Sequence, residues 1–413
     1  MAQSKKLDLS KYERLSLGID IGTSHCEAVV YGKSADKKDE QLFHYTDEPL
    51  LIKCMSSLIY FAKDNDTSIN YLRKFQESHK LPLQVEVIDG MQMPYVFFDQ
   101  VEELLSGNKI DDDAHEILVR STRCLYPIKT LSKDEEYDEL ESAVIRLNIQ
   151  RTLSPYILDG IPLDIAFAKP CETGANYNSI LTDVSEKIVA GNETFDNRFI
   201  IRSEAVFTGH YLANVLNAEQ GSVVVCDIGA GTGDVYIFDQ DDSRTKAMRT
   251  FLNAGNFCSE KLVETLKEYC DVDISYRDAN SLKEEHGFIT GYSSPKVLKP
   301  ILADLYINGK PRKVRAGKAI DAAVRPVCQD AVRTVSEIFA EYGGHHPKIV
   351  AVTGFMGQVD GLDDSIQEGL GINGYNVTVK NLLKFNESDP RSIVAKGAEH
   401  YSRGTANEHW TSL

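Results

Sequence analysis

The sequence predicts an α/β fold built from two similar lobes, and three observations support this. First, a buried strand followed by an aspartate and a glycine turn occurs twice, at 17–24 (LGIDIGTS) and 224–232 (VVCDIGAGT). Second, the order strand, hairpin, helix, strand, helix also occurs twice, which is an α/β pattern rather than an all-α or all-β one. Third, 413 residues are enough for two domains that each have a core.

Individual elements follow from apolar periodicity and from helix and turn signals. Strands are expected at 15–21, 27–31, 58–62, 83–88, 162–168, 199–201, 223–227, 235–238, 348–352 and 377–379. Helices are expected at 71–78, 135–154, 177–189, 204–216, 259–270, 319–342, 362–370 and 392–401, with a charged loop at 33–40. Ser259 is the expected cap of its helix, and Pro326 either kinks its helix or begins the main part of it.

Composition narrows the classes of function. A net charge of −17 makes nucleic-acid or anionic-membrane binding an unfavourable expectation. Residues 1–13 are polar, and no run approaches the roughly 20 apolar residues that span a bilayer, so we expect a soluble cytoplasmic protein without direct membrane insertion. The 8 cysteines include no CxxC pair, which argues against a zinc or redox motif and favours reduced thiols.

The first glycine turn is a candidate phosphate and metal site. Gly22 lets the backbone approach phosphate oxygens, and the hydroxyls of Thr23 and Ser24 add donors. Asp20, at the strand end, is placed to hold Mg²⁺ through water. An ordinary β-hairpin turn explains the same residues equally well when this segment is taken alone.

The second turn repeats this arrangement and makes an accident much less probable. Asp227 is the expected second carboxylate on the metal side. The backbone N–H groups of the turn that follows are expected to bind phosphate oxygens, as is the threonine hydroxyl. The turn consists of Gly229, Ala230, Gly231 and Thr232. Asp234 is expected to be structural, at the head of the return strand.

A third strand ends in glycines that introduce a helix. Residues Gly354, Phe355, Met356 and Gly357 follow the strand at 348–352. Such a turn can hold adenosine and the α-phosphate at a helix N-terminus. A plain connection between a strand and a helix is the simpler alternative.

Two further segments carry charged residues with possible roles. Glu204 begins a helix after a short strand and could orient the water that attacks a γ-phosphate, although Ser203 and Glu204 also suit helix capping. Lys283 and Glu284 could bind ribose hydroxyls, or form a solvated helix end. His25 lacks the partners of a catalytic triad, so we expect it to be structural.

These segments resemble the ATPase superfamily of actins, heat-shock chaperones and sugar kinases, in which the three turns occur in this order. The bacterial actin-like branch is favoured by three details of the sequence. Glu204 lies 23 residues before Asp227 (227 − 204), Gly255 follows the second hairpin and introduces a helix, and a Lys-Glu pair stands at 283–284. Within that branch the chain looks most like the MamK family of magnetosome-associated filament proteins.

The resemblance implies two RNase-H-like domains of the actin fold that flank a nucleotide cleft, each with a smaller inserted subdomain. It implies binding of ATP, which becomes ADP, together with Mg²⁺. Asp20 and Asp227 would be the metal-side carboxylates and would act in catalysis with Glu204, while Gly255 would join the phosphate and nucleoside contacts. The expected boundaries are a tail at 1–13, domain I at 14–217 with an insertion at 40–120, domain II at 218–402 with an insertion at 275–320, and a tail at 403–413.

Two segments depart from the pattern of that branch. Phe355 and Met356 stand in the adenosine turn, where a run of three glycines and a serine is usual, and they could pack on the base. Gly233 and Asp234 follow Thr232, where a second threonine is common.

The resemblance also implies a function. We expect a cytoplasmic, cytoskeletal ATPase that assembles into filaments, with hydrolysis timing their turnover and with organelle-associated adaptor proteins as partners. On the MamK resemblance, the filament would position magnetosomes. The alternative is a non-polymerising ATPase of the same superfamily, either chaperone-like or a small-molecule kinase.

Overall fold

The computed structural model describes most of the chain and divides it into two compact units. The described residues are 12–22, 25–35, 43–45, 50–127, 135–154, 161–170, 174–189, 198–215, 222–239, 244–296, 300–307, 310–342, 347–381, 393–404 and 411–412. Unit 1 comprises Met1–Phe207 and Val394–Leu413, and unit 2 comprises Thr208–Ile393. The last helix therefore belongs to unit 1, whereas the sequence had placed residues 218–402 together in the second lobe.

Unit 1 is built on a seven-stranded sheet with the order β18-β10-β9-β1-β2-β3, in which β4 also pairs with β2. Its strands are β1 (Arg14–Ile21), β2 (His25–Ala35), β3 (Phe43–Tyr45), β4 (Leu51–Ser56), β9 (Leu163–Lys169), β10 (Arg198–Ser203) and β18 (Thr411–Ser412). The predicted hairpin of β1 and β2 is confirmed, and β9 runs parallel to both β1 and β10. Strand β2 continues to Ala35, so the loop expected from residue 33 begins later.

Helices cover this sheet and close its core. They are α4 (Glu139–Leu153), α5 (Tyr177–Val189), the first turn of α6 (Glu204–Val215), which continues into unit 2 from Thr208, and α12 (Ile393–Gly404). Helix α4 begins with a capping box in which Asp138 and Glu141 satisfy each other's backbone N–H groups. Strand residues such as Leu17, Ile19 and Phe167 are fully buried in the same core as side chains of α4 and α5.

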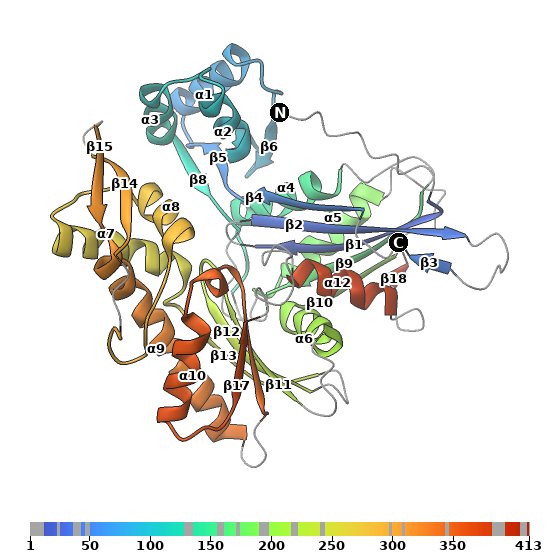
Figure 1. The fold of residues 1–413 in the computed structure, drawn as a ribbon. Coiled ribbons are helices and arrows are strands. Elements are labelled where there is room, and N and C mark those ends of the chain that lie inside the picture. The colour runs from blue at the N-terminus through green and yellow to red at the C-terminus, as the bar shows by residue number, and fades with distance from the viewer. Residues whose placement is uncertain are drawn as a thin grey trace. The chain divides into compact units, whose positions relative to one another are not determined.

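Helix α12 returns to unit 1 because its backbone packs directly on β1, as the red helix beside the blue strands in Figure 1 shows. A Cβ at Gly18 would lie 1.9 Å from the carbonyl oxygen of Ala395, so a larger residue there would push the helix away. Ala398 and Tyr401 share a buried cluster with Phe207. These contacts explain why the end of the chain joins the first unit.

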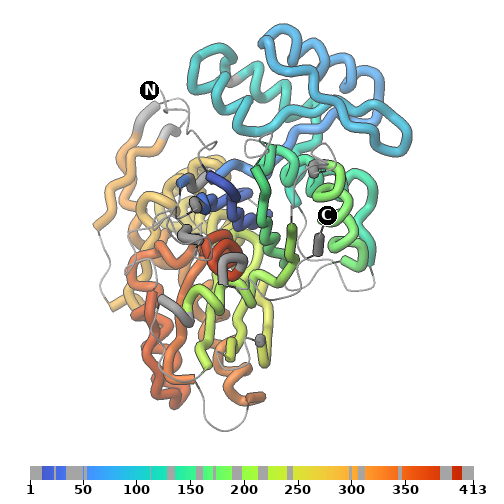
Figure 2. The backbone as a smooth tube through the Cα atoms, turned by 90° about the vertical axis from the view of Figure 1, so that its right-hand side faces the viewer, coloured from blue at the N-terminus to red at the C-terminus, as the bar shows by residue number. Residues whose placement is uncertain are grey.

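A second, smaller sheet of unit 1 has the order β6-β7-β5-β8. Its elements are β5 (Ile59–Ala62), α1 (Asp66–Ser78), β6 (Val85–Ile88), β7 (Met91–Phe97), α2 (Phe98–Ser106), α3 (Asp112–Ser121) and β8 (Thr122–Leu125). The run folds on itself, in light blue and teal in Figure 2. This small sheet lies largely within the span expected for an inserted subdomain, with a core that includes Phe61, Leu72 and Val96.

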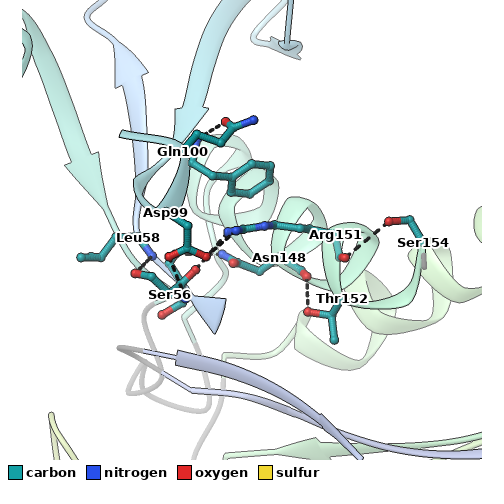
Figure 3. Close-up of polar contacts among 10 residues, drawn as sticks. Ser56, Leu58, Asp99, Gln100, Asn148, Arg151, Thr152 and Ser154 are labelled. Carbon is teal, nitrogen blue, oxygen red and sulfur yellow. Dashed lines mark hydrogen bonds and ion pairs between the residues drawn. The ribbon is translucent and has the colours of Figure 1, made fainter. Parts of the chain in front are cut away.

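Polar contacts fasten the start of the small sheet to α4 (Figure 3). The guanidinium of Arg151 pairs with the carboxylate of Asp99 and lies 4.2 Å from the centre of the Phe97 ring. The side-chain amide of Asn148 donates to the carbonyl oxygen of Ser57 at 3.0 Å. Because Asn148 is almost fully buried, this bond satisfies a polar group that would otherwise be costly to bury.

Unit 2 contains a five-stranded sheet with the order β13-β12-β11-β16-β17 and a separate hairpin of β14 and β15. Its strands are β11 (Val223–Ile228), β12 (Gly233–Asp239), β13 (Arg244–Phe251), β14 (Leu302–Ile307), β15 (Lys310–Arg315), β16 (Ile349–Thr353) and β17 (Thr378–Asn381). Its helices are α7 (Gly255–Cys270), α8 (Tyr276–His286), α9 (Gly317–Tyr342), η2 (Phe355–Gln358) and α10 (Leu362–Ile372). The predicted strands at 223–227, 235–238 and 348–352 are confirmed.

Two sequence expectations about the helices of unit 2 are corrected. Ser259 does not cap its helix, because α7 already begins at Gly255 and the buried Ser259 hydroxyl donates to the carbonyl oxygen of Gly255 at 3.1 Å. Pro326 does not begin a helix, because α9 starts nine residues earlier, at Gly317. In both cases buried side chains continue the helix beyond the local sequence signal.

None of the 7 described cysteines forms a disulfide bond. Burial raises the pKa of Cys258 to about 11 and that of Cys328 to about 12, so both are protonated near neutral pH. Among the described helices, none has the length and apolar character needed to cross a membrane.

Candidate functional site

In unit 2, the second and third turns meet at one edge of the sheet. Strands β11 and β16 are parallel neighbours, with Asp227 opposite Thr353, so the turns that follow them lie side by side. Gly354 adopts φ 78° and ψ 172°, a region that is essentially restricted to glycine. A Cβ at Gly354 would lie 2.4 Å from Oδ1 of Asp227 and 2.5 Å from the carbonyl oxygen of Ile228. Glycine is therefore what allows the third turn to contact the carboxylate of the second.

The N-terminus of α7 closes over the second turn. The backbone N–H of Gly255 donates to the carbonyl oxygen of Gly229 at 3.0 Å, and that of Asn256 donates to Ala230 at 2.6 Å. In a trans peptide the N–H points opposite to the C=O. The N–H groups of Ala230 and Gly231 therefore point away from α7, as donors of a phosphate-binding turn must. A Cβ at Gly255 would lie 3.0 Å from the Gly229 oxygen, so glycine permits this close packing.

The turn itself is held by its own hydrogen bonds. The N–H of Gly229 donates to the carbonyl oxygen of Thr232 at 2.9 Å. The carboxylate of Asp234 accepts from the Thr232 hydroxyl at 3.3 Å and from the Thr250 hydroxyl at 2.5 Å. Asp234 thus braces the turn against β13, which agrees with the structural role expected for it.

The two residues of the third turn that were expected to contact a base differ in their exposure to solvent. Met356 is fully buried in the core of unit 2 and also lines the small cavity beside Phe355. Phe355 is only half-buried and lines a small cavity with Glu284 and Gln358, among others, of about 10 Å³, room for about one water molecule. The carbonyl oxygen of Gly357 accepts from the side-chain amide of Asn381 at 2.7 Å, which fixes the turn to β17.

Lys283 is a buried brace between α7 and α8. Its ammonium donates to the Gly255 carbonyl oxygen at 2.9 Å, the Ser259 hydroxyl at 2.9 Å and the Asn280 side-chain oxygen at 2.8 Å. An ammonium has three hydrogens, so these bonds use all of them. This arrangement argues against the ribose contact expected for Lys283. Glu284 accepts from Asn280 at 2.7 Å and is exposed.

Replacing Lys283 with methionine is expected to lower the free energy of unfolding at neutral pH by about 1–3 kcal/mol, because three buried acceptors lose their donor. Burial lowers the pKa of Lys283 from its ordinary 10.5. At a pH between the lowered pKa of the folded protein and the ordinary pKa of the unfolded chain, the unfolded chain binds more protons at Lys283. The free energy of unfolding of the wild type should therefore rise, relative to that of the variant, as pH increases through this range. Denaturant unfolding at a series of alkaline pH values measures this.

Lys261 provides the control for that experiment. It lies on the neighbouring helix α7, its side chain is 40% exposed, and its hydrogen bond to Glu264 raises its pKa. The variant Lys261→Met should therefore show no growing advantage of the wild type with pH. Equal pH dependence of the two variants would contradict the role of Lys283 as a buried cation.

In unit 1, Asp20 and Glu204 lie at one edge of the large sheet. Asp20 is opposite Ala168, and Ala168 is opposite Arg202, two residues before Glu204. Strands lie about 4.8 Å apart, so β1 and β10 are about 10 Å apart across β9. Both carboxylates are largely buried, with 8% of Asp20 and 9% of Glu204 exposed. The Ser203 hydroxyl accepts from the N–H of Val206 at 3.4 Å, so it is the cap of α6.

The first turn is described only in part. The N–H of Gly22 donates to the carbonyl oxygen of His25 at 2.9 Å, and a Cβ at Gly22 would lie 2.4 Å from the same oxygen. Glycine is therefore needed to close this turn before β2. Thr23 and Ser24 lie outside the described residues, so their expected phosphate contacts stay predictions.

One carboxylate beside Asp20 was missed in the sequence. Glu27 lies directly opposite Asp20 in the β1–β2 hairpin and is only 3% exposed. The thiol of Cys54, on β4, lies 3.7 Å from its Oε1. The hairpin register gives the signal that could have identified it, because a turn after Gly22 places residue 27 across from residue 20.

The donors present suit a Mg²⁺ ion that keeps most of its water. Within the described parts of the chain, no three His, Cys, Asp or Glu side chains gather into a metal-binding group. Mg²⁺ is usually held by one or two carboxylates together with water and substrate phosphates, so a dedicated protein cage is not required. The close packing of Gly354 against Asp227 places one such carboxylate beside the phosphate turn.

Comparisons with known proteins address the fold. No protein-family model matches the chain, and no curated protein sequence matches it either. The structure of the MamK double helical filament is similar with a TM-score of 0.60 and 18% identity, covering 94% of this chain and 99% of that chain. MreB5 of Spiroplasma citri bound to ADP has a TM-score of 0.56 and 14% identity, with 96% and 99% covered.

An archaeal actin homologue, Ta0583, is similar with a TM-score of 0.51 and 15% identity, covering 94% of this chain and 99% of that chain. These likenesses extend over nearly the whole chain and include both units. Together with the mixed α/β sheets and the matched strand-Asp-Gly turns, they establish the architecture. The chain therefore has the actin fold, shared with MamK, MreB5 and the archaeal actin homologue.

Proposed function

We propose that this chain binds ATP with Mg²⁺ and hydrolyses it. The observation that carries the proposal is the meeting of two glycine turns and the N-terminus of α7 in unit 2, where Gly354 contacts Asp227 and Gly255 packs on the second turn. This packing aims the N–H groups of Ala230 and Gly231 away from α7, the direction that donors to a phosphate need. Structures with the same fold were determined with AMPPNP and ADP bound, which supports nucleotide binding here.

Each residue has a defined part in the proposed hydrolysis. Asp227 and Asp20 hold the hydrated Mg²⁺, which neutralises phosphate charge when it is bound. The N–H groups of the turn at 229–232 cradle the phosphates. The carboxylate of Glu204 orients the attacking water and accepts its proton.

We propose further that the protein assembles into filaments in the cytoplasm as part of a cytoskeleton. Two MamK structures of the same fold are filaments, which supports self-association. Hydrolysis would time filament turnover, and adaptor proteins would connect the filament to its cargo. Positioning of magnetosomes is the cargo role that the MamK likeness favours.

The fate of the γ-phosphate distinguishes this proposal from a small-molecule kinase. Purified protein with Mg·ATP should release inorganic phosphate at the same rate with or without added sugars and other hydroxyl compounds. Asp227→Ala should remove the activity and serves as the control for contaminating phosphatases. Transfer of phosphate to an acceptor, detected by mass spectrometry, would replace the filament proposal with a kinase.

A further inference from the structure

The small sheet of unit 1 exposes an apolar stripe on β6. Val85 and Val87 are 39% and 54% exposed on one face of β6, and Leu83, two residues before the strand, is 65% exposed. The opposite face is anchored, since Ile88 is buried and Glu86 pairs with Arg146 of α4 at 3.0 Å. The strand is therefore fixed in the fold while its apolar side faces solvent.

This strand also lies at the edge of its sheet. Among the described strands, β6 pairs with β7 alone. Asp89 and Gly90, with φ values of 51° and 76°, form the two-residue turn that joins them. Natural edge strands are usually protected by a charge or a proline on the strand itself, yet the exposed stripe of β6 is apolar and Pro82 precedes the strand. Such an edge is a template for pairing with another strand.

The two ends of the edge carry opposite charge. At the turn, the N–H of Asp89 donates to the carboxylate of Glu139 at 2.9 Å. The hydrogen bond with Glu139, together with the nearby charges of Asp138 and Asp64, raises the pKa of Asp89, so acidic groups gather there. The exposed Lys80 lies at the other end. Antiparallel pairing of two identical edges brings the lysine of each copy to the acidic end of the other.

We propose that β6 pairs antiparallel with β6 of a second copy of this chain, in a register centred on Val85. In this register Val85 meets its own counterpart, Leu83 meets Val87, and Lys80 comes beside Asp89. A shift by two residues would instead oppose Glu86 with its own counterpart, and the opposite charges at the ends would move apart. The self-complementary stripe and the end charges together select the second copy as the occupant.

This contact deepens the proposed self-assembly by supplying a lateral contact. It is isologous, so it joins two copies, and a different head-to-tail contact must extend a filament. One pair of short strands is a small interface, but repetition along two filaments adds many such contacts. The β6 contact should therefore be strongest in the assembled state.

A cysteine at Val85 tests the register directly. In an antiparallel pair, opposite Cα atoms lie about 4.5–5.5 Å apart, which is within the range that a disulfide spans. Val85→Cys should give a covalent dimer under mild oxidation. Gln92→Cys, exposed on the neighbouring β7, and the wild type with its exposed Cys124 should not. If Val85→Cys gives no more covalent dimer than Gln92→Cys although the protein sediments as polymer, the β6 contact is wrong. The proposed assembly would then remain.

A charge placed on the stripe provides the second test. Val87→Lys, added to Val85→Cys, should reduce the cross-linked dimer about tenfold, because the lysine would be buried against Leu83 of the second copy. Ile117→Lys is the matched control, since Ile117 of α3 is 52% exposed and lies outside the stripe. Equal dimer yields from the two variants would overturn the proposal. Absence of both cross-links and polymer would overturn the contact together with the proposed assembly.

Discussion

Replacing Gly354 with alanine is expected to abolish ATP binding and to lower the free energy of unfolding by about 3 kcal/mol or more. The backbone at Gly354 adopts φ 78° and ψ 172°, which costs a residue with a side chain about 1–3 kcal/mol. The new Cβ would also lie 2.4 Å from Oδ1 of Asp227, so the carboxylate and its turn must move. Denaturant unfolding and titration with a fluorescent ATP analogue measure the two effects.

Gly374→Ala is the control that distinguishes the backbone strain of a positive φ from the steric collision of a new Cβ. Gly374 has a positive φ of 87°, but a Cβ there would meet no atom within 4 Å. The control should therefore lose about 1 kcal/mol of stability and keep its affinity for nucleotide. If Gly354→Ala bound the analogue as tightly as Gly374→Ala does, the third turn would have no part in the nucleotide site.

Replacing Glu204 with glutamine is expected to slow phosphate release by a factor of about 10²–10⁴, the usual contribution of a general base. Glutamine keeps the size of the side chain but cannot accept the proton of the attacking water. Nucleotide binding and assembly should remain, so filaments formed with ATP should persist far longer than those of the wild type. Phosphate release and light scattering followed in parallel measure both properties.

Ser203→Ala distinguishes catalysis from helix capping at this position. The Ser203 hydroxyl accepts from the Val206 N–H, so its loss should cost about 1 kcal/mol of stability with little change in turnover. An unchanged rate of phosphate release in Glu204→Gln would mean that Glu204 serves only the start of α6.

The sequence alone predicted the elements that carry the turns. The strand before Asp227 is a continuous apolar run, and the strand before Asp20 places Leu15, Leu17 and Ile19 between small residues, which suits strands buried on both faces. The helix at 177–189 was predicted with the bounds that the structure shows. These segments have strong local signals, so their position in the fold and the order of the turns could be deduced.

Other elements lack a local signal. Strand β7 contains Pro94, a residue that argues against a strand, and it pairs as part of the hairpin with β6. Strand β13 (RTKAMRTF) is rich in charge and lies at the edge of its sheet, so it shows little of the apolar pattern of a buried strand. Each of these strands is specified by its neighbours in the sheet.

The candidate site, like these strands, could be predicted from the sequence only in part. Lys283 lies 28 residues after Gly255 in the chain and binds its carbonyl oxygen only because α7 and α8 pack together. The sequence left two alternatives for Lys283, a contact with ribose hydroxyls or a solvated helix end, whereas the ammonium is buried among protein acceptors. Met356 likewise belongs to the core. Residues on the glycine turns could be predicted, but which side chains face a ligand depends on tertiary packing.

High-speed sedimentation combined with electron microscopy tests the central claim most directly, with Mg·ATP, Mg·ADP and no nucleotide compared in parallel. The proposed function predicts filaments in the pellet with Mg·ATP, and loss of the pellet as ATP is converted to ADP. The absence of filaments and pellet in all three conditions, over a range of salt and protein concentrations, would contradict a nucleotide-driven polymer and leave a non-polymerising ATPase of the actin fold.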